Sequence, residues 1–251
     1  MTALHEKKLP AGYEVFARYA FPPNELGYCG PADSEVLLRA DDPTEVAAHA
    51  KEFDGAWPYL RAIAEAADIP DPLDADVVGS YWIGGPLLDC VDRAHLVAEL
   101  RRAFTGQVTG LLGDLDRTHA ALAHHSFHVF VVYPWVRFLD RDAAVALKVL
   151  QDCRIRWGTV ESVDGDDVAV AARPLTFADG ILGLGEPRLE RLRWRKDGVS
   201  LIGSPQLGEV VSAHWDWACG VLNDTECAAL AEATQTTLDL VNAARSEEQN
   251  R

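Results

Sequence analysis

The stretch Cys153-Arg-Ile-Arg-Trp-Gly-Thr-Val160, continued by Glu161-Ser-Val-Asp164-Gly165-Asp166, marks a change in the pattern of the sequence. Upstream of it, apolar residues recur at the spacing of helices, whereas from Cys153 onward they alternate with a period of two, as in a β-strand. Asp164-Gly165 then signals a hairpin, because glycine adopts the positive φ angles that tight turns require. The stretch therefore predicts the junction between a helical region and a β-rich region.

Residues 1–150 predict a mainly helical domain. Asp42-Pro43-Thr44-Glu45 is a strong helix start, because it combines a capping aspartate, a proline at the first helical position and a glutamate three residues after the cap. Residues 91–105 and 107–123 carry apolar residues at helical spacing. Pro22-Pro23 is expected to stop any earlier helix, because proline lacks the N–H group that the helix needs.

Residues 151–251 predict a small β-barrel followed by a helix. After the first strand, further short strands are expected at 168–174, 189–194 and 209–213. Short strands at this spacing are typical of barrels. Asn223 or Asp224 can cap a final amphipathic helix that extends to about Ala243. We therefore expect an α+β protein with a helical N-terminal domain, an OB-like β-barrel and a C-terminal helix.

The composition favours a cytoplasmic protein without nucleic acid or membrane partners. The 251 residues include five cysteines, an odd and widely spread set that does not suit a disulfide framework. No apolar run approaches the roughly 20 residues of a membrane-spanning helix. The formal net charge is −16, with an acidic excess in both halves of the chain, whereas nucleic acids and anionic membranes attract basic proteins.

A cluster of histidines, His124-His125-Ser-Phe-His128, suggests one possible metal site. On a helix, His124 and His128 share a face because they are four residues apart, so they can bind one metal ion, while His125 points elsewhere. The alternative is a set of buried histidines that bond to backbone or carboxylate groups. The segment has no glutamate in the register of a zinc protease, which excludes that class.

The second half of the chain resembles the small hydrogenase-assembly chaperones of the HypC/HupF type. The resemblance rests on Cys153-x-x-x-x-Gly-x-Val160 with the Val163-Asp-Gly-Asp166 turn, and on the segment Leu207–Glu226, which contains Val-Val-Ser-Ala-His214-Trp-Asp-Trp. Chaperones of this family open with a cysteine, continue into a strand with an Asp-Gly turn, and carry a histidine in a later strand. The resemblance covers roughly residues 151–243.

The resemblance implies a specific function. In that family, the cysteine and the histidine hold the iron fragment that bears CO and cyanide, and the chaperone passes it between a HypD-like scaffold protein and the hydrogenase large subunit. Carried over, Cys153 and His214 form the iron site. Thiolate and imidazole are suitable ligands for such iron. The sequence departs from the family in three respects. Trp157 stands where the family usually has proline, and the segment between the cysteine and the histidine is longer than in the chaperones. The family cysteine also becomes the mature N-terminus with a free amine, whereas Cys153 is internal.

The whole chain also resembles an uncharacterised actinobacterial family associated with NiFe-hydrogenase gene clusters. The motifs are Ala-Phe-Pro-Pro-Asn, His-His-x-Phe-His and His-Trp-Asp-Trp-x-Cys. We therefore expect a hydrogenase maturation factor. One alternative is an iron- or haem-dependent enzyme that supplies a diatomic ligand and uses His124 and His128, with Cys29 or His214. The other is a metal-free scaffold protein. The sequence assigns no catalytic residue.

Overall fold

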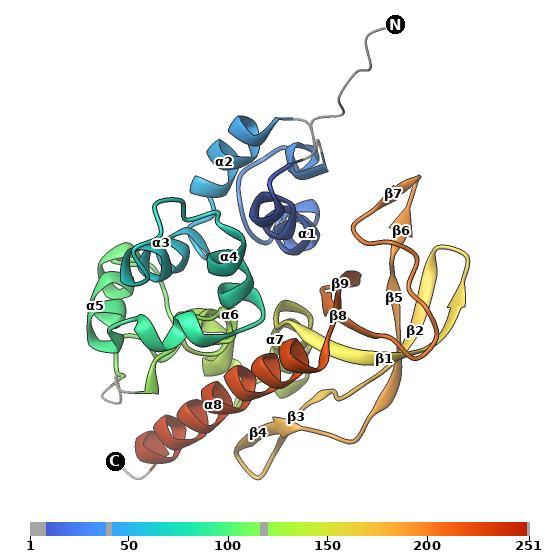
Figure 1. The fold of residues 1–251 in the computed structure, drawn as a ribbon. Helices are drawn as coiled ribbons and strands as arrows, with labels where there is room; N and C mark the ends of the chain where they lie inside the picture. Colours follow the sequence, from blue (N-terminus) through green and yellow to red (C-terminus); the bar gives the residue numbers. More distant parts are fainter. Residues whose placement is uncertain (1–8, 39–41, 116–119, 250–251) are drawn as a thin grey trace, which may run out of the picture.

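The computed structural model describes residues 9–38, 42–115 and 120–249. Helices fill the first part of the chain, strands the second, and a long helix closes it (Figure 1). The first-part helices are α1 Ala11–Glu25, η1 Ser34–Leu38, α2 Pro43–Lys51, α3 Trp57–Ala66, α4 Ala75–Trp82, η2 Pro86–Cys90, α5 Arg93–Ala103, α6 His125–Phe127, η4 His128–Val132, η5 Pro134–Phe138 and α7 Ala143–Cys153. The α+β class is therefore confirmed.

The helix start at Asp42 is confirmed. Its carboxylate accepts hydrogen bonds from the backbone N–H groups of Thr44 at 2.9 Å and Glu45 at 3.4 Å. These are donors that the first turn of α2 leaves without an intrahelical partner.

The prediction that Pro22-Pro23 stops the first helix is wrong. Helix α1 continues through both prolines to Glu25. They lie in its last turns, where the fixed φ of proline is compatible with the helix and only the two N–H groups are missing. The helix ends instead just before Gly27, whose φ is +72°. The missing N–H groups matter for the functional site described below.

The predicted helix over 107–123 is also not found, since neither 107–115 nor 120–123 forms an α-helix; residues 116–119 lie outside the described part. The backbone of this segment bonds to another element instead. Gly110 donates to the carbonyl of Val132 at 2.9 Å, and Leu111 donates to that of Val131 at 2.7 Å. These tertiary hydrogen bonds to η4 override the helical apolar spacing.

Five strands form the main sheet, in the order β1-β2-β5-β9-β8, and β8 pairs back with β1 so that the sheet closes. They are β1 Arg156–Asp164, β2 Asp167–Ala172, β5 Arg188–Arg193, β8 Val210–His214 and β9 Trp217–Leu222. The neighbours pair antiparallel except for β5 and β9, which meet in parallel through the single pair Arg193↔Trp217. This arrangement agrees with the expected small OB-like barrel.

Two short hairpins extend from the main sheet. They consist of β3 Leu175–Ala178 with β4 Ile181–Leu184, and of β6 Arg195–Lys196 with β7 Val199–Ser200. The hairpin predicted at Asp164-Gly165 is present between β1 and β2, and Gly165 has a φ of +60°.

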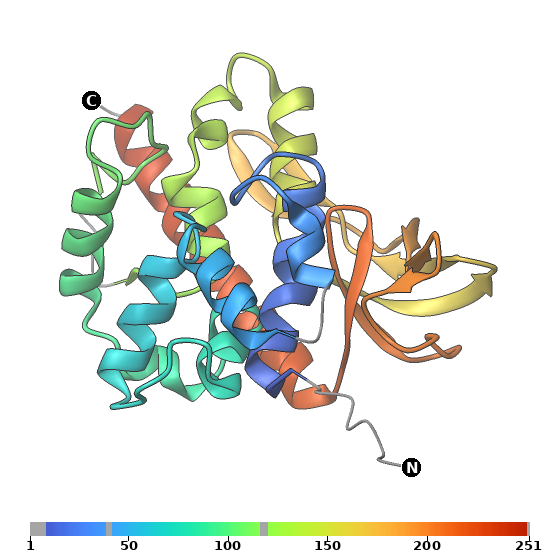
Figure 2. The same cartoon turned by 90° about the horizontal axis from the view of Figure 1, so that it is seen from above.

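The final helix, α8 Asp224–Gln249, starts with a capping box. The Asn223 side chain accepts from the N–H of Glu226 at 3.0 Å, and the Glu226 carboxylate accepts from the N–H of Asn223 at 2.9 Å. Figures 1 and 2 show α8 running along the helical part of the molecule. One hydrophobic core joins helical residues such as Phe127 to Trp217 of β9 and Val241 of α8, and a second fills the barrel.

Helix α7 crosses the predicted domain boundary at residue 150, and the division into two domains stays a prediction. No helix in the described residues combines the length and apolar character of a membrane span.

Candidate metal centre

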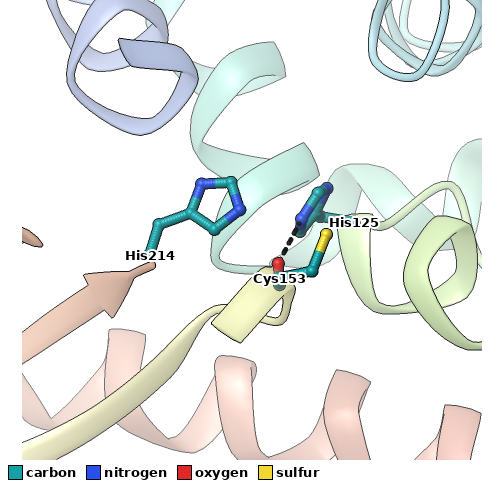
Figure 3. Close-up of side chains that lie close together, drawn as sticks. All are labelled: His125, Cys153 and His214. Carbon is teal, nitrogen blue, oxygen red and sulfur yellow. Dashed lines mark hydrogen bonds between the residues drawn. The ribbon is translucent and has the colours of Figure 1, made fainter. Parts of the chain in front are cut away.

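Three side chains from separate parts of the chain converge beneath the surface: His125 from α6, Cys153 at the end of α7 and His214 at the end of β8 (Figure 3). One ligand atom of each lies within 4.8 Å of the other two. All three residues are buried, with exposed fractions of 5%, 2% and 1%. The structure thus brings together Cys153 and His214, the pair that the resemblance singled out, and adds a third group.

A hydrogen bond to the backbone determines which ring nitrogen of His214 carries the proton. Its Nδ1 lies 2.7 Å from the carbonyl oxygen of Tyr19 in α1. A carbonyl can only accept, so Nδ1 carries the hydrogen and Nε2 keeps a lone pair. That Nε2 atom is buried and makes no hydrogen bond of ordinary geometry, although the backbone of Cys153 is near enough to raise the pKa of the ring slightly against the larger effect of burial. An orphaned lone pair in a buried site costs free energy, and Nε2 has the protonation state that a metal ligand requires.

His125 has partners at both ring nitrogens. Nε2 lies 2.9 Å from the carbonyl of Cys153, and Nδ1 lies 3.1 Å from the hydroxyl of Tyr81, which is also 2.9 Å from the carbonyl of Gly55. In one arrangement, Nε2–H donates to Cys153. In the other, Nδ1–H donates to the Tyr81 oxygen and the tyrosine O–H donates to Gly55, which leaves a lone pair on Nε2; because that lone pair faces the Cys153 carbonyl oxygen, metal binding through Nε2 requires the ring to turn away from this carbonyl. Gly55 supplies the acceptor that the second arrangement requires.

Burial keeps the three groups neutral in the absence of metal. It lowers the pKa of His125 to about 4 and that of His214 well below the usual range. It raises the pKa of the Cys153 thiol well above the usual range, and the nearby Cys29 and Asp152 raise it further. Neutral imidazoles can bind a metal directly, whereas the thiol releases a proton when the metal binds. Two imidazoles and a thiolate form a set that suits iron or zinc and leaves a further position open.

An aromatic ring and an arginine hold the elements around the site. The indole of Trp82 packs against both imidazoles, with centroids 4.6 Å from His125 and 5.6 Å from His214. Arg156, buried at the start of β1, donates to the backbone carbonyl of Trp215 and to the carboxylate of Glu190 at 2.6 Å. These contacts keep the segment after Cys153 beside the turn that follows His214.

The β8–β9 turn has an unusual backbone. Trp215 has a φ of +52°, which is uncommon for a residue other than glycine. Its N–H donates to the carbonyl of Asp152 at 2.8 Å. The centroid of its ring lies 4.1 Å from the centroid of the Tyr28 ring. A surface groove of about 680 Å³ is lined by Asp152, Trp215 and Tyr28. In the sequence, Asp152 is next to Cys153, Trp215 is next to His214, and Tyr28 is next to Cys29. This groove is therefore the surface feature next to the buried site.

His124 and His128 do not share a helical face. His124 precedes α6 in an extended conformation and caps it, since its Nδ1 accepts the N–H of Ser126 at 3.0 Å. His128 begins the π-helical turn η4, and its Nδ1 lies 3.5 Å from the Tyr59 hydroxyl. Burial lowers the pKa of both imidazoles to about 3. Neither residue belongs to the group around Cys153.

Cys29, which the enzyme hypothesis also named, lies outside the three-residue group as well. It is half-buried, and burial raises the pKa of its thiol to about 11, although a hydrogen bond with Tyr133 acts in the opposite direction.

Sequence reasoning missed His125, which the structure turns toward Cys153 and His214. No local spacing in the sequence links these residues, because His125 reaches the site through the packing of α6 against the α7–β1 junction. The one available signal was chemical: His125 lies in a histidine-rich segment, and the resemblance left one ligand unaccounted for.

The chain matches the model of a family described as a family of unknown function, DUF6390, over residues 8–248. No curated protein and no solved structure matches it. The matched region contains the helical part, the sheet, the three converging side chains and nearly all of α8. The chain therefore belongs to the DUF6390 family.

Proposed function

We propose that this protein is a NiFe-hydrogenase maturation factor that binds an iron fragment on Cys153 and His214, with His125 as a third ligand. The observation that carries the proposal is the convergence of these ligand atoms within 4.8 Å. The resemblance selected Cys153 and His214 from sequence motifs alone, without knowledge of their separation in space. Two residues chosen for a shared iron site lie at ligand distance from each other, as that function requires.

His125 offers an answer to the internal position of Cys153. In the family that the second half resembles, the cysteine begins the mature chain and its amine is available. Here the peptide before Cys153 removes that amine, and the first half of the chain supplies an imidazole instead. This gives the helical region a role in the site, because α6 carries the third ligand.

In this proposal, each residue of the site has a separate role in binding the iron fragment. His214 and His125 bind through neutral nitrogens, Cys153 binds after losing its proton, and Trp82 packs against both imidazoles. An iron fragment is the cargo in this proposal. The groove lined by Tyr28 and Trp215 lies next to the site, so a hydrogenase large subunit or a HypD-like scaffold would exchange cargo there.

The alternatives have less support. An iron or haem enzyme that uses His124 and His128 would need both on one helical face, and His124 is in extended backbone instead. A metal-free scaffold gives no role to the convergence of His125, Cys153 and His214.

The test is anaerobic purification from a host that expresses a hydrogenase gene cluster, followed by iron analysis and infrared spectroscopy. We expect iron and bands of metal-bound CO or cyanide in the wild type, and their loss in Cys153→Ala. Cys219→Ala is the matched control, because Cys219 is also buried in the second half but lies outside the group. A wild-type protein that co-purifies with hydrogenase subunits but carries no metal would refute the proposal, as would bands that persist in Cys153→Ala.

A further inference from the structure

We propose that Pro23 is a positioning residue for the metal centre: because it has no N–H group, the carbonyl of Tyr19 is free to orient His214. The placement of the His214 proton follows from geometry alone. The consequence for metal binding rests on the function proposed above.

The first step concerns helix α1. In an α-helix, the carbonyl of each residue accepts the N–H of the residue four positions later. For Tyr19 that residue is Pro23, which has no N–H, although α1 continues to Glu25. The Tyr19 carbonyl therefore lacks its usual partner within a continuous and buried helix. Such a buried acceptor needs a donor from elsewhere.

The donor comes from β8. Nδ1 of His214 lies 2.7 Å from this carbonyl, while the hydroxyl of Tyr19 lies 2.6 Å from the hydroxyl of Ser212. Ser212 and His214 are two residues apart on β8, so strand alternation puts them on the same face. Tyr19 thus contacts that face at two points. Its ring also stacks on Trp82 with centroids 5.5 Å apart, which holds α1 in place.

The second step concerns the proton. Since the carbonyl accepts, His214 carries its hydrogen on Nδ1 and presents the Nε2 lone pair to Cys153 and His125. A residue with an N–H group at position 23 would compete for the Tyr19 carbonyl. His214 could then adopt the other tautomer, in which Nε2 carries the hydrogen and cannot bind metal. Partners of this kind, which fix the tautomer of a ligand histidine, typically change metal affinity by about 10–100-fold.

The chain offers a matched control in Pro22. Pro22 and Pro23 are adjacent, both are buried, and both remove a hydrogen bond from the same helix. Replacing Pro22 restores a donor for the carbonyl of Arg18, which does not contact His214. Replacing Pro23 restores a donor for the carbonyl of Tyr19. Each substitution adds a helical hydrogen bond, so circular dichroism should show an intact fold in both variants.

The first measurement uses the metal-free protein labelled with ¹⁵N in histidine. Two-bond ¹H–¹⁵N correlation spectra distinguish the two tautomers of His214. We expect the Nδ1–H form in the wild type and in Pro22→Ala, and a mixture or the Nε2–H form in Pro23→Ala. Tyr19→Phe, which keeps the carbonyl but loses the Ser212 contact, should retain the Nδ1–H form. An unchanged His214 spectrum in Pro23→Ala would overturn the inference, whatever the protein binds.

The second measurement is an anaerobic titration with Fe²⁺. Pro23→Ala should weaken binding by about 10–100-fold, and Pro22→Ala should leave it close to the wild type. If wild-type protein binds Fe²⁺ and Pro23→Ala binds it equally well, the role of Pro23 is refuted while the iron function stands. If the wild type binds no iron but the tautomer changes in Pro23→Ala, the iron function is refuted and the orienting role of Pro23 is supported.

Discussion

At the scale of single residues, the structure explains why the motif that follows Cys153 has a glycine at position 158. The sequence identified it only as part of the spacing after Cys153. In the structure, Gly158 lies on the buried side of β1, and a Cβ atom there would sit 2.7 Å from the carbonyl oxygen of Ala171 on the paired strand β2. The absence of a side chain therefore permits the close approach of these two strands.

This close approach makes a prediction about stability. Gly158→Ala should destabilise the protein by about 1–3 kcal/mol, because the methyl group forces the backbone of β1 away from β2. Gly183→Ala in β4 is the control, since its nearest neighbour would be the Thr176 hydroxyl at 3.7 Å. Urea unfolding monitored by tryptophan fluorescence gives both values. Equal losses in the two variants would show that steric crowding at Gly158 is not the cause.

The residues of the site differ in how far the sequence could identify them. Cys153 and His214 came from motifs, because the resemblance contains both in order. His125 could not be found in this way, since its role depends on the packing of α6 against a junction distant in the chain. The helical spacing of His124 and His128 misled because His124 caps the helix and lies outside it. Spacing rules apply only within an element, and sequence rarely locates an element end to the residue.

At the scale of elements, the sequence predicted well which segments are helical and which are β-rich, but it predicted poorly where individual helices and strands are interrupted. The caps at Asp42 and Asn223 and the hairpin at Gly165 were visible because specific side chains or glycine form them. The turn between β8 and β9 was not, and β9 was missed, because Trp215 adopts a positive φ without any glycine, asparagine or proline signal. Tertiary contacts impose this conformation: the N–H of Trp215 donates to Asp152, and its carbonyl accepts from Arg156.

Arg156 therefore yields a prediction about how elements position the site. Arg156→Met should cost about 3 kcal/mol of stability, because it leaves a partly buried Glu190 without its partner. It should also weaken Fe²⁺ binding, since the β8–β9 turn loses its attachment beside Cys153.

The control for Arg156 is Arg154→Met. Arg154 is equally buried but donates to the carbonyl of Arg173 and to the side chain of Gln151, with no bond to the β8–β9 turn. Chemical unfolding and anaerobic Fe²⁺ titration of both variants separate the two effects. If Arg154→Met weakens iron binding as much as Arg156→Met, general destabilisation explains the result and the positioning role is excluded.

At the scale of the whole molecule, the candidate site joins the two kinds of structure. His125 lies among the helices, His214 ends a strand of the sheet, and Cys153 lies where α7 leads into β1. A metal ion bound to all three would link the helical part to the sheet. Such a ligand set exists only in the folded chain, so metal binding and folding stability are coupled.

This coupling predicts a thermal shift. Anaerobic Fe²⁺ at about 100 times its Kd should stabilise the wild type by about 2.7 kcal/mol, which corresponds to roughly 5–10 °C in Tm for a chain of this length. Chelation should reverse the shift. Cys153→Ala should show none, and Cys227→Ala should keep it, because Cys227 lies in α8 outside the group. A shift of the same size in Cys153→Ala would place the metal elsewhere.

The closure of the barrel has a further consequence. Strands β5 and β9 share one backbone pair, Arg193↔Trp217, and side chains reinforce it: Arg193 forms an ion pair with Asp216 and lies over the ring of Trp217, 5.3 Å from its centroid. The β2–β5 ladder consists of six backbone pairs, and dissolved salt barely affects neutral backbone hydrogen bonds. An ion pair that is partly open to solvent is screened by salt. Salt therefore removes a larger share of the strength of this joint, which has one backbone pair, than of the β2–β5 ladder, where Arg191 also pairs with Asp167 but six backbone pairs join the strands.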